Sequence, residues 1–294
     1  MWRLLPLLGK TGEFAKRDHE QYRVVRTAYE RHRQTDLESA RLLEVGCGTR
    51  HGVTLLFHSA GASIVGIDSA HQALGLAALS PLEWRRRGAT RTLQNALRAA
   101  VFDGRYYAAL EREFGRPLRR DSVDVRAMEV EALDFPDQHF DFIFSTAVFE
   151  HLSDVPSAAR EIARVLKPGG FVFLSIHLFP GISGGHNLEW SSPQLDLQRS
   201  CPPWDHLLES RYPARVYLNR LRERDYVRIL GEHFDLLASD PLYEGERYLT
   251  PAIADRLRDY SRDELLKTSV NLHLRKPSSS PVRPAAAAGR RPIG

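Results

Sequence analysis

The glycine-rich turn at residues 42–52 holds the residue types that most directly suggest chemistry. An apolar run ends in Glu44, and Gly46 and Gly48 follow at once. Glycine lacks a Cβ, so the backbone can pass close to a ligand and adopt a positive φ. A second apolar run ends in Asp68, whose carboxylate can accept hydrogen bonds from the hydroxyls of a ribose. These residues predict a site for a ribose-containing cofactor at the carboxyl edge of an α/β sheet.

A dinucleotide fingerprint would place a third glycine where this chain has His51, which weakens an NAD-type interpretation without eliminating it. Two longer strings decide between the cofactors: MEVEALDFPDQHFDFIFSTAVFEHLSD and REIARVLKPGGFVFLSIH. Together with the glycine-rich turn they resemble the class I S-adenosylmethionine-dependent methyltransferases, in particular the group that methylates small molecules. The resemblance covers residues 42–177 and the last two predicted strands. It implies an enzyme whose cofactor is S-adenosyl-L-methionine.

The resemblance also implies a role for each residue that matches a family motif. The methionine end of the cofactor would lie against the glycine-rich turn, and the ribose against the end of the second strand. The adenine would lie between a carboxylate and a backbone N–H after the third strand, and the sulfonium at the end of the fourth. In that order, the expected cofactor-binding residues are Glu44, Gly46, Cys47, Gly48, Asp68, Ser69, Glu129, Val130, Ser145 and Thr146. The KPGG turn at residues 167–170 would be structural.

Two residues of the turn need separate interpretation. Many family members have a third glycine where this chain has Arg50, and the next glycine here is Gly52. Arg50 either begins the helix and points to solvent, or its guanidinium faces the carboxylate of the cofactor or an acidic group of the substrate. A thiol at a helix N-terminus can have a lowered pKa. In the family, however, the position of Cys47 is commonly a small residue whose backbone serves the cofactor, so we expect no catalytic role for this thiol.

Histidines supply the candidate general bases. Methyl transfer from a sulfonium is an in-line displacement, so the protein mainly aligns the reacting atoms and excludes water. A base is needed only for an acceptor that enters protonated, and imidazole titrates near neutrality. His151 follows the fourth predicted strand and faces the transfer site in the resembling family; the alternative is that it only packs beside the cofactor. His186 is the second catalytic candidate.

An insertion at residues 177–228 has a composition that suits a substrate lid. Its glycines permit a tight loop, Trp190 and Trp204 would supply apolar walls, and its histidines would supply hydrogen bonds or a base. A loop packed for stability alone is the alternative. His186, Asp205 and His206 could be imagined as metal ligands, but their spacing matches no standard zinc motif, and we expect no metal.

The elements that must position these residues follow from the hydrophobic pattern. Seven β-rich runs with helical stretches between them predict a doubly wound, mostly parallel seven-stranded α/β sheet, the Rossmann-like methyltransferase fold. The predicted strands are residues 41–45, 63–67, 122–127, 140–145, 170–176, 233–238 and 269–274, and a helix is predicted at 14–33. We expect a helical cap at 1–36, a methyltransferase domain at 37–276 with insertions at 81–120 and 177–228, and a disordered tail at 277–294.

Composition excludes several classes of protein. The 294 residues are 43% hydrophobic and 27% charged, which suits a globular chain. No apolar stretch reaches the roughly 18 residues of a membrane span, and two cysteines are too few for a disulfide framework, so a cytoplasmic setting is expected. The insertion at 81–120 carries ten arginines against four acidic residues. It either attracts an anionic acceptor or forms a solvated basic face.

Three functions from different classes follow from these observations. The leading one is a methyltransferase acting on a small molecule or a glycan, at oxygen. The second is a nucleic-acid or protein methyltransferase, supported only by the arginine-rich insertion and by no nucleic-acid-binding motif. The third is a catalytically silent cofactor-binding partner subunit. Retention of all the expected cofactor residues disfavours this third function.

Overall fold

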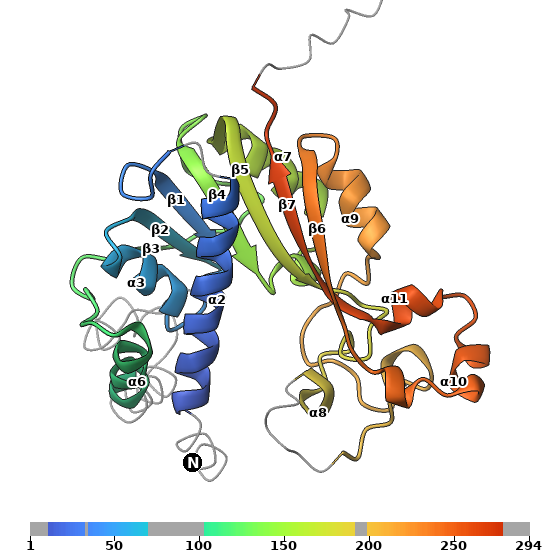
Figure 1. Ribbon diagram of the computed structural model, residues 1–294. Coiled ribbons are helices and arrows are strands. Elements are labelled where there is room, and N and C mark those ends of the chain that lie inside the picture. Colours follow the sequence, from blue (N-terminus) through green and yellow to red (C-terminus); the bar gives the residue numbers. More distant parts are fainter. Residues whose placement is uncertain (1–10, 33–34, 70–102, 192–198, 279–294) are drawn as a thin grey trace, which may run out of the picture.

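A single seven-stranded sheet organises the protein. The computed structural model describes residues 11–32, 35–69, 103–191 and 199–278. Its strands lie in the order β3-β2-β1-β4-β5-β7-β6, and only β7 runs antiparallel to its neighbours β5 and β6. The strands are β1 (Arg41–Val45), β2 (Ser63–Asp68), β3 (Asp124–Ala127), β4 (Phe140–Thr146), β5 (Leu166–His177), β6 (Asp235–Tyr243) and β7 (Lys267–Arg275). The predicted doubly wound, mostly parallel sheet is confirmed (Figure 1).

Strand bounds differ from the predicted ones where the sequence carries a turn residue. β5 starts at Leu166 rather than at 170, because the KPGG segment pairs with the chain after β7 through Gly169 N–H to Lys276 O (2.9 Å) and Lys276 N–H to Gly170 O (3.0 Å). β6 continues past the predicted end at 238 through Pro241 to Tyr243. A proline is tolerated there because β6 is the edge strand.

The two faces of the sheet carry separate cores because successive side chains of a strand point in opposite directions. Phe142 and Phe144 pack on one face with α2 (Thr11–His32), α3 (Gly52–Ser59) and α6 (Gly104–Phe114). Ile143 packs on the other face with α7 (Val155–Val165) and α9 (Glu223–Leu230). Figure 1 shows α2 running along one side of the sheet and α7 with α9 on the opposite side. No described helix is both long and apolar enough to cross a membrane.

Helix α2 is the predicted N-terminal helix, and it begins three residues earlier than the predicted start at residue 14. Its apolar face meets the sheet and the neighbouring helices. The ring centroid of Tyr29 lies 5.0 Å from that of Phe142, and the ring centroid of Tyr22 lies 4.8 Å from that of Phe57. Helix α2 therefore covers the sheet face next to the glycine-rich turn.

The segment after β5 and the two C-terminal helices share a third, smaller core. The segment contains α8 (Leu188–Ser191) and η5 (Asp205–Leu207), and η6 (Glu246–Tyr248), α10 (Pro251–Arg256) and α11 (Arg262–Leu266) follow later; η3 (Phe149–His151) lies earlier, between β4 and α7. Trp204 is fully buried in this core, and its Nε1–H donates to Leu265 O at 3.2 Å. Trp204 therefore stabilises the segment. Residues 81–102 of the first predicted insertion and residues 279–294 of the predicted tail lie outside the described residues.

Candidate functional site

The turn after β1 has the backbone geometry that its glycines predict. Gly46 and Gly48 have φ values of 79° and 67°, and the N–H groups of Gly46 and Cys47 both donate to Ile67 O, at 2.8 and 3.0 Å. A Cβ on Gly46 would lie 2.1 Å from Val148 Cγ2, whereas a Cβ on Gly48 would meet no atom within 4 Å. The turn is thus packed on its Gly46 side and open at Gly48.

Asp68 is held against this turn. Its Oδ2 accepts a hydrogen bond from the Gly48 N–H at 2.9 Å. A cavity of about 330 Å³ opens beside the pair. Of the expected cofactor residues, those lining this cavity are Gly46, Gly48, Asp68, Ser69, Glu129 and Val130. The carboxylates of Asp68 and Glu129 therefore border one space, which is the arrangement that a ribose and an adenine require.

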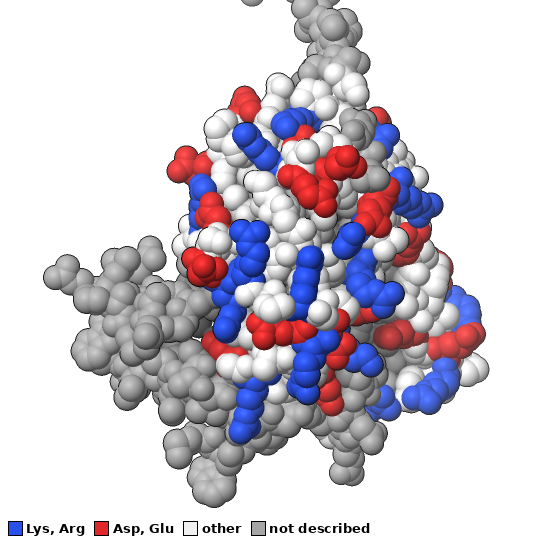
Figure 2. All heavy atoms as spheres, turned by 60° about the vertical axis from the view of Figure 1, so that its left-hand side comes forward, with Lys and Arg blue, Asp and Glu red and all other residues white. Residues whose placement is uncertain are grey.

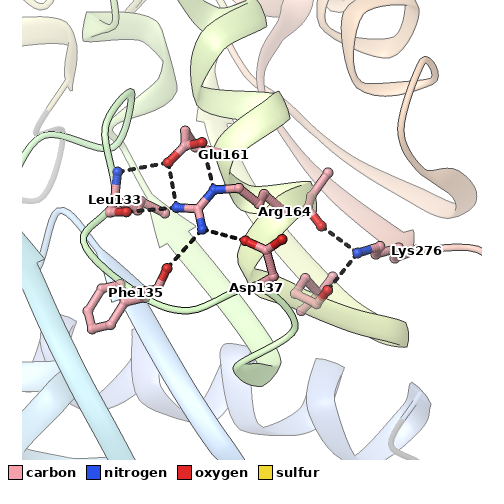
Figure 3. Close-up of polar contacts among 8 residues, drawn as sticks. Leu133, Phe135, Asp137, Glu161, Arg164 and Lys276 are labelled. Carbon is pink, nitrogen blue, oxygen red and sulfur yellow. Dashed lines mark hydrogen bonds and ion pairs between the residues drawn. The ribbon is translucent and has the colours of Figure 1, made fainter.

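Arg164 of α7 fixes the loop that carries Glu129 and Val130. Its guanidinium donates to Glu161, Asp137 and the backbone oxygens of Leu133 and Phe135 through five hydrogen bonds of 2.7–2.9 Å. Glu161 in turn accepts the Leu133 N–H at 2.9 Å. Figure 3 shows Arg164 at the centre of this set, between helix α7 and the loop. Sequence reasoning missed Arg164, because its partners are separated from it by up to 31 residues.

Glu44 lies in β1, just before the same turn. Its side chain is only 3% exposed, and its Oε2 accepts a hydrogen bond from the Thr54 hydroxyl of α3. Burial raises the pKa of Glu44 to about 8, and the nearby Asp18 and Asp68 add to that rise. Glu44 lines a second cavity, of about 460 Å³, together with Gly46, Gly48 and Thr146. Near neutral pH this carboxyl is protonated in the ligand-free protein.

Helix α2 forms the opposite wall of the second cavity. Asp18 lies in that wall and accepts a hydrogen bond from the Tyr106 hydroxyl at 2.5 Å. A Cβ on Gly52 would fall 2.1 Å from the Tyr106 hydroxyl oxygen, so glycine is required where α3 begins. Arg50 precedes α3, lines the cavity and stacks its guanidinium over the rings of Phe14 (4.7 Å) and Tyr106 (5.1 Å). Of the two alternatives for Arg50, the one in which it begins the helix is therefore wrong, because α3 begins at Gly52.

Ser145 and Thr146, the two residues expected near the sulfonium, have different surroundings at the end of β4. Thr146 lines the 460 Å³ cavity and also a third cavity of about 830 Å³. Ser145 is buried and donates its hydroxyl to Val45 O at 2.9 Å, within the sheet. Of the two tryptophans expected to wall a substrate space, Trp190 lines the 830 Å³ cavity. This third cavity lies between α2 and strands β5, β6 and β7.

His151 and His186, the two expected catalytic residues, come together; His151 also lines the 330 Å³ cavity. Their ring centroids lie 4.8 Å apart, and the centroids of His177 and His186 lie 5.5 Å apart. His151 donates its Nδ1–H to Tyr217 O at 2.8 Å. Glu150, which is 3% exposed, completes the group. Sequence reasoning did not select Glu150 or join it to His177, because Glu150 belongs to η3 and His177 ends β5.

The contacts of Glu150 with the histidines are not ion pairs at neutral pH. His177 Nδ1 and His186 Nε2 lie 3.8 and 3.9 Å from Glu150 Oε1, a separation that an ion pair could have. Burial lowers the pKa of both histidines, that of His186 to about 4, so both rings are neutral. Burial raises the pKa of Glu150 to about 7; the backbone N–H groups of Glu150 and His177 oppose that rise without reaching hydrogen-bonding geometry.

Three other polar residues that the sequence suggested as candidates make contacts within the fold. Cys47 is buried, and burial raises the pKa of its thiol well above the ordinary value, which makes it a poor nucleophile. His206 Nε2–H donates to Phe179 O at 2.8 Å. Asp205 Oδ2 accepts the Tyr212 N–H at 2.9 Å. Within the described ranges, His186 converges with Glu150 and His177 rather than with Asp205 and His206.

Comparison with known proteins identifies the family. The sequence model of the family described as Methyltransferase domain matches residues 17–232. A ubiquinone/menaquinone biosynthesis C-methyltransferase of Shewanella sediminis is 37% identical over 90 residues, 29% of this chain and 31% of that protein. A ubiquinone biosynthesis O-methyltransferase of Sinorhizobium medicae is 29% identical over 178 residues, 56% of each chain. This chain therefore spans less than two thirds of the length of these relatives.

The protein is also similar to solved structures, at low sequence identity. The S-adenosylmethionine-dependent methyltransferase from Mesorhizobium loti is 16% identical, with a TM-score of 0.47 over 84% of this chain and 95% of that one. The corresponding protein from Methanosarcina mazei is also 16% identical, with a TM-score of 0.45 over 85% and 97%. The family match over residues 17–232 and the strand order carry the assignment. This chain belongs to the class I S-adenosylmethionine-dependent methyltransferases.

Proposed function

We propose that this protein transfers the methyl group of S-adenosylmethionine to a hydroxyl oxygen of a small molecule. The observation that carries the proposal is the continuity of the three cavities. The 330 and 460 Å³ cavities share Gly46, Gly48 and Ala147. The 460 and 830 Å³ cavities share Thr146 and His177, together with residues of α2 and α8. An extended cofactor in the first two cavities would therefore direct its methyl group toward the third.

The chain's own residues define how the cofactor would lie. The adenosine would occupy the 330 Å³ cavity between Asp68 and Glu129, and the methionine end would pass over Gly48 toward Glu44. Gly48 supports this path because a side chain there would project into open space rather than into protein. The ammonium group of the methionine end carries a positive charge, which would favour the ionised form of the Glu44 carboxyl.

The reaction requires alignment and the removal of one proton. The acceptor oxygen forms a bond to the methyl carbon while the carbon–sulfur bond breaks, so S-adenosylhomocysteine leaves as a neutral thioether. The hydroxyl proton must pass to a group at the mouth shared by the two larger cavities, where His177 lies. The neutral rings of His177 and His186 and the carboxyl of Glu150 supply proton acceptors there. Proton acceptors at this position suit a hydroxyl acceptor, whose proton must be removed.

The 830 Å³ cavity suits an acceptor with an apolar body. Val24, Val25, Phe173, Trp190 and Leu242 form its apolar walls. Its charged lining consists of the carboxylates of Glu13, Glu20, Asp240 and Glu244 and the cations of Lys16 and Arg17. This balance supports a neutral or cationic acceptor, whereas the expectation of an anionic one rested on the insertion at 81–120, of which residues 81–102 are not described.

The described part of the face drawn in Figure 2 gives little support to a nucleic-acid substrate. A nucleic-acid-binding protein gathers lysine and arginine on one face to contact the phosphate backbone. Figure 2 shows basic and acidic side chains interspersed over the face that carries α2 and α6. The small-molecule proposal therefore agrees better with this face than the second function considered from the sequence.

Two measurements on the full-length protein test the proposal. Calorimetric titration with S-adenosylmethionine and S-adenosylhomocysteine, with NAD as the control, should show micromolar binding of the first two alone. Incubation with methyl-labelled cofactor and a panel of phenolic and aliphatic alcohols should then yield O-methylated products, identified by mass spectrometry. His151→Ala, which removes the ring that packs against His186 beside the adenosine cavity, should lower turnover. Cofactor binding without transfer to any alcohol, or transfer to carbon, RNA or peptide instead, would refute the proposal.

A further inference from the structure

A buried group of metal-ligand side chains lies beside the cavities. One carboxylate oxygen of Glu150, one ring nitrogen of His177 and one of His186 all lie within 4.8 Å of one another. Both carboxylate oxygens of Glu150, His177 Nδ1 and His186 Nε2 are buried and have no hydrogen-bond partner among the described residues. Leaving one such group buried and unpaired costs about 1–3 kcal/mol, and four such atoms converge here.

The three side chains are held in place by their surroundings. Glu150 belongs to η3, where the Asn219 amide donates to Phe149 O at 2.7 Å and to Leu152 O at 3.1 Å. His177 is the last residue of β5. His186 has a φ of 52° and follows Gly184 and Gly185, where a Cβ would come within 2.1 Å of Phe179 O and 2.6 Å of the His206 side chain. The ligand atoms are therefore presented by rigid segments, as a functional site needs.

From this convergence we propose that Glu150, His177 and His186 bind a divalent first-row transition metal ion of the Zn²⁺ class. Two imidazoles and one carboxylate are the ligand set of catalytic zinc and of non-haem iron sites, which keep further coordination positions open. Ligand atoms at about 2.1 Å from a tetrahedral ion lie about 3.4 Å apart. The separations from Glu150 Oε1, 3.8 and 3.9 Å, exceed that value slightly, and all three ligand atoms lie within 4.8 Å of one another, so the side chains would have to close around the ion.

The position of the cluster agrees with this assignment. His177 lines both larger cavities, so the open positions of the ion would face the mouth between cofactor and acceptor. A cation there would lower the pKa of an acceptor hydroxyl and would so replace the three side chains, then bound as ligands, in promoting the loss of its proton, a role that rests on the proposed function. Metal binding itself does not depend on that function.

Metal titration of the full-length chain tests the site without cofactor or acceptor. Protein stripped with a chelator should take up one Zn²⁺ per chain with a Kd below about 1 µM, and Co²⁺ should give the visible absorption of a low-coordinate site. Glu150→Gln and His186→Gln should each weaken Zn²⁺ binding by at least about 100-fold, since even indirect partners of metal ligands contribute 10–100-fold. The control variant His233→Gln, which changes a histidine beside Phe234, should bind as the wild type does.

Thermal unfolding provides a second readout. Zn²⁺ should raise the melting temperature of the wild type and of His233→Gln, but not that of Glu150→Gln or His186→Gln. In the presence of chelator, Glu150→Gln should melt no lower than the wild type, because an amide replaces a buried, unpaired carboxyl. Absence of Zn²⁺ and Co²⁺ uptake by folded wild type, or uptake that both ligand variants retain, would overturn the proposal. Tight uptake by a protein that methylates no alcohol would leave the metal site standing and refute only the proposed function.

Discussion

Replacing Glu44 by glutamine should remove a large part of the pH dependence of folding stability. The carboxyl of Glu44 is 3% exposed, and its pKa is raised from 4.5 to about 8 in the folded protein. Between these two values the folded chain keeps a proton that the unfolded chain has lost, so stability decreases as pH rises through that window. A difference of about 3.5 pKa units between the folded and the unfolded chain corresponds to a total decrease of about 5 kcal/mol in the free energy of unfolding across this window. The decrease should begin near pH 4.5 and end near pH 8.

Glutamine is a suitable replacement because it keeps the local hydrogen bond. The Thr54 hydroxyl donates to Glu44 Oε2, and the amide oxygen of glutamine can accept the same bond. At pH 5 the wild type and Glu44→Gln should therefore have nearly equal free energies of unfolding. At pH 8 the variant should be more stable by several kcal/mol. Other buried groups with shifted pKa values, such as Glu150, titrate in both proteins and cancel in the difference.

Urea unfolding of both proteins, in chelator-treated buffers from pH 5 to pH 8.5, measures this difference. The slope of the wild-type minus variant free energy should reach about 1.4 kcal/mol per pH unit in the middle of the window. A difference that stays flat from pH 5 to pH 8 would show that the carboxyl is ionised in the folded protein. The account of Glu44 as a protonated wall of the cofactor cavity would then be wrong.

Two further predictions concern the adenosine end of the site. Arg164→Ala should lower the free energy of unfolding by about 2–3 kcal/mol and weaken cofactor binding, because five charge-assisted hydrogen bonds hold the loop after β3. The matched control Arg160→Ala removes an exposed arginine of the same helix whose guanidinium donates to the Ser157 hydroxyl, and should stay within about 0.5 kcal/mol of the wild type in urea unfolding. Asp68→Ala should weaken S-adenosylmethionine binding by about 1.5–3 kcal/mol in calorimetry; unchanged affinity in a folded variant would contradict the ribose assignment.

The fold could be predicted from the sequence because the signals for parallel strands are local. Continuous apolar runs such as 171–174 are typical of central strands that are covered on both faces, and all seven predicted strands are present. The errors occur where tertiary context overrides a local signal. Pro241 ends a strand by local rules, yet the edge position of β6 tolerates it. The KPGG segment has the composition of a turn, yet it pairs with the chain after β7.

The site could be predicted only where its residues follow one another along the chain. Gly46, Gly48 and Asp68 stand at the ends of the first two strands, and the fold places them at one cavity. The partners Asp18 and Tyr106 are 88 residues apart, and no local pattern joins them. The group formed by Glu150, His177 and His186 comes from η3, from the end of β5 and from a later loop, so no spacing rule for metal ligands could find it. Convergence of this kind is visible only in three dimensions.

Helix α2 belongs to the site as much as to the scaffold. Arg17 and Gln21 line both the 460 and the 830 Å³ cavities, so the cofactor and the acceptor would share this wall. The same part of α2 is held by a hydrogen bond, which Asp18 accepts from the Tyr106 hydroxyl. This pair lies against Gly52, the first residue of the helix that follows the glycine-rich turn. Burial and the neighbouring Asp18 raise the pKa of Tyr106, which keeps its hydroxyl a donor across the physiological range. The glycine-rich turn and the wall that the acceptor would meet are therefore joined through the contact of Asp18 and Tyr106 at Gly52.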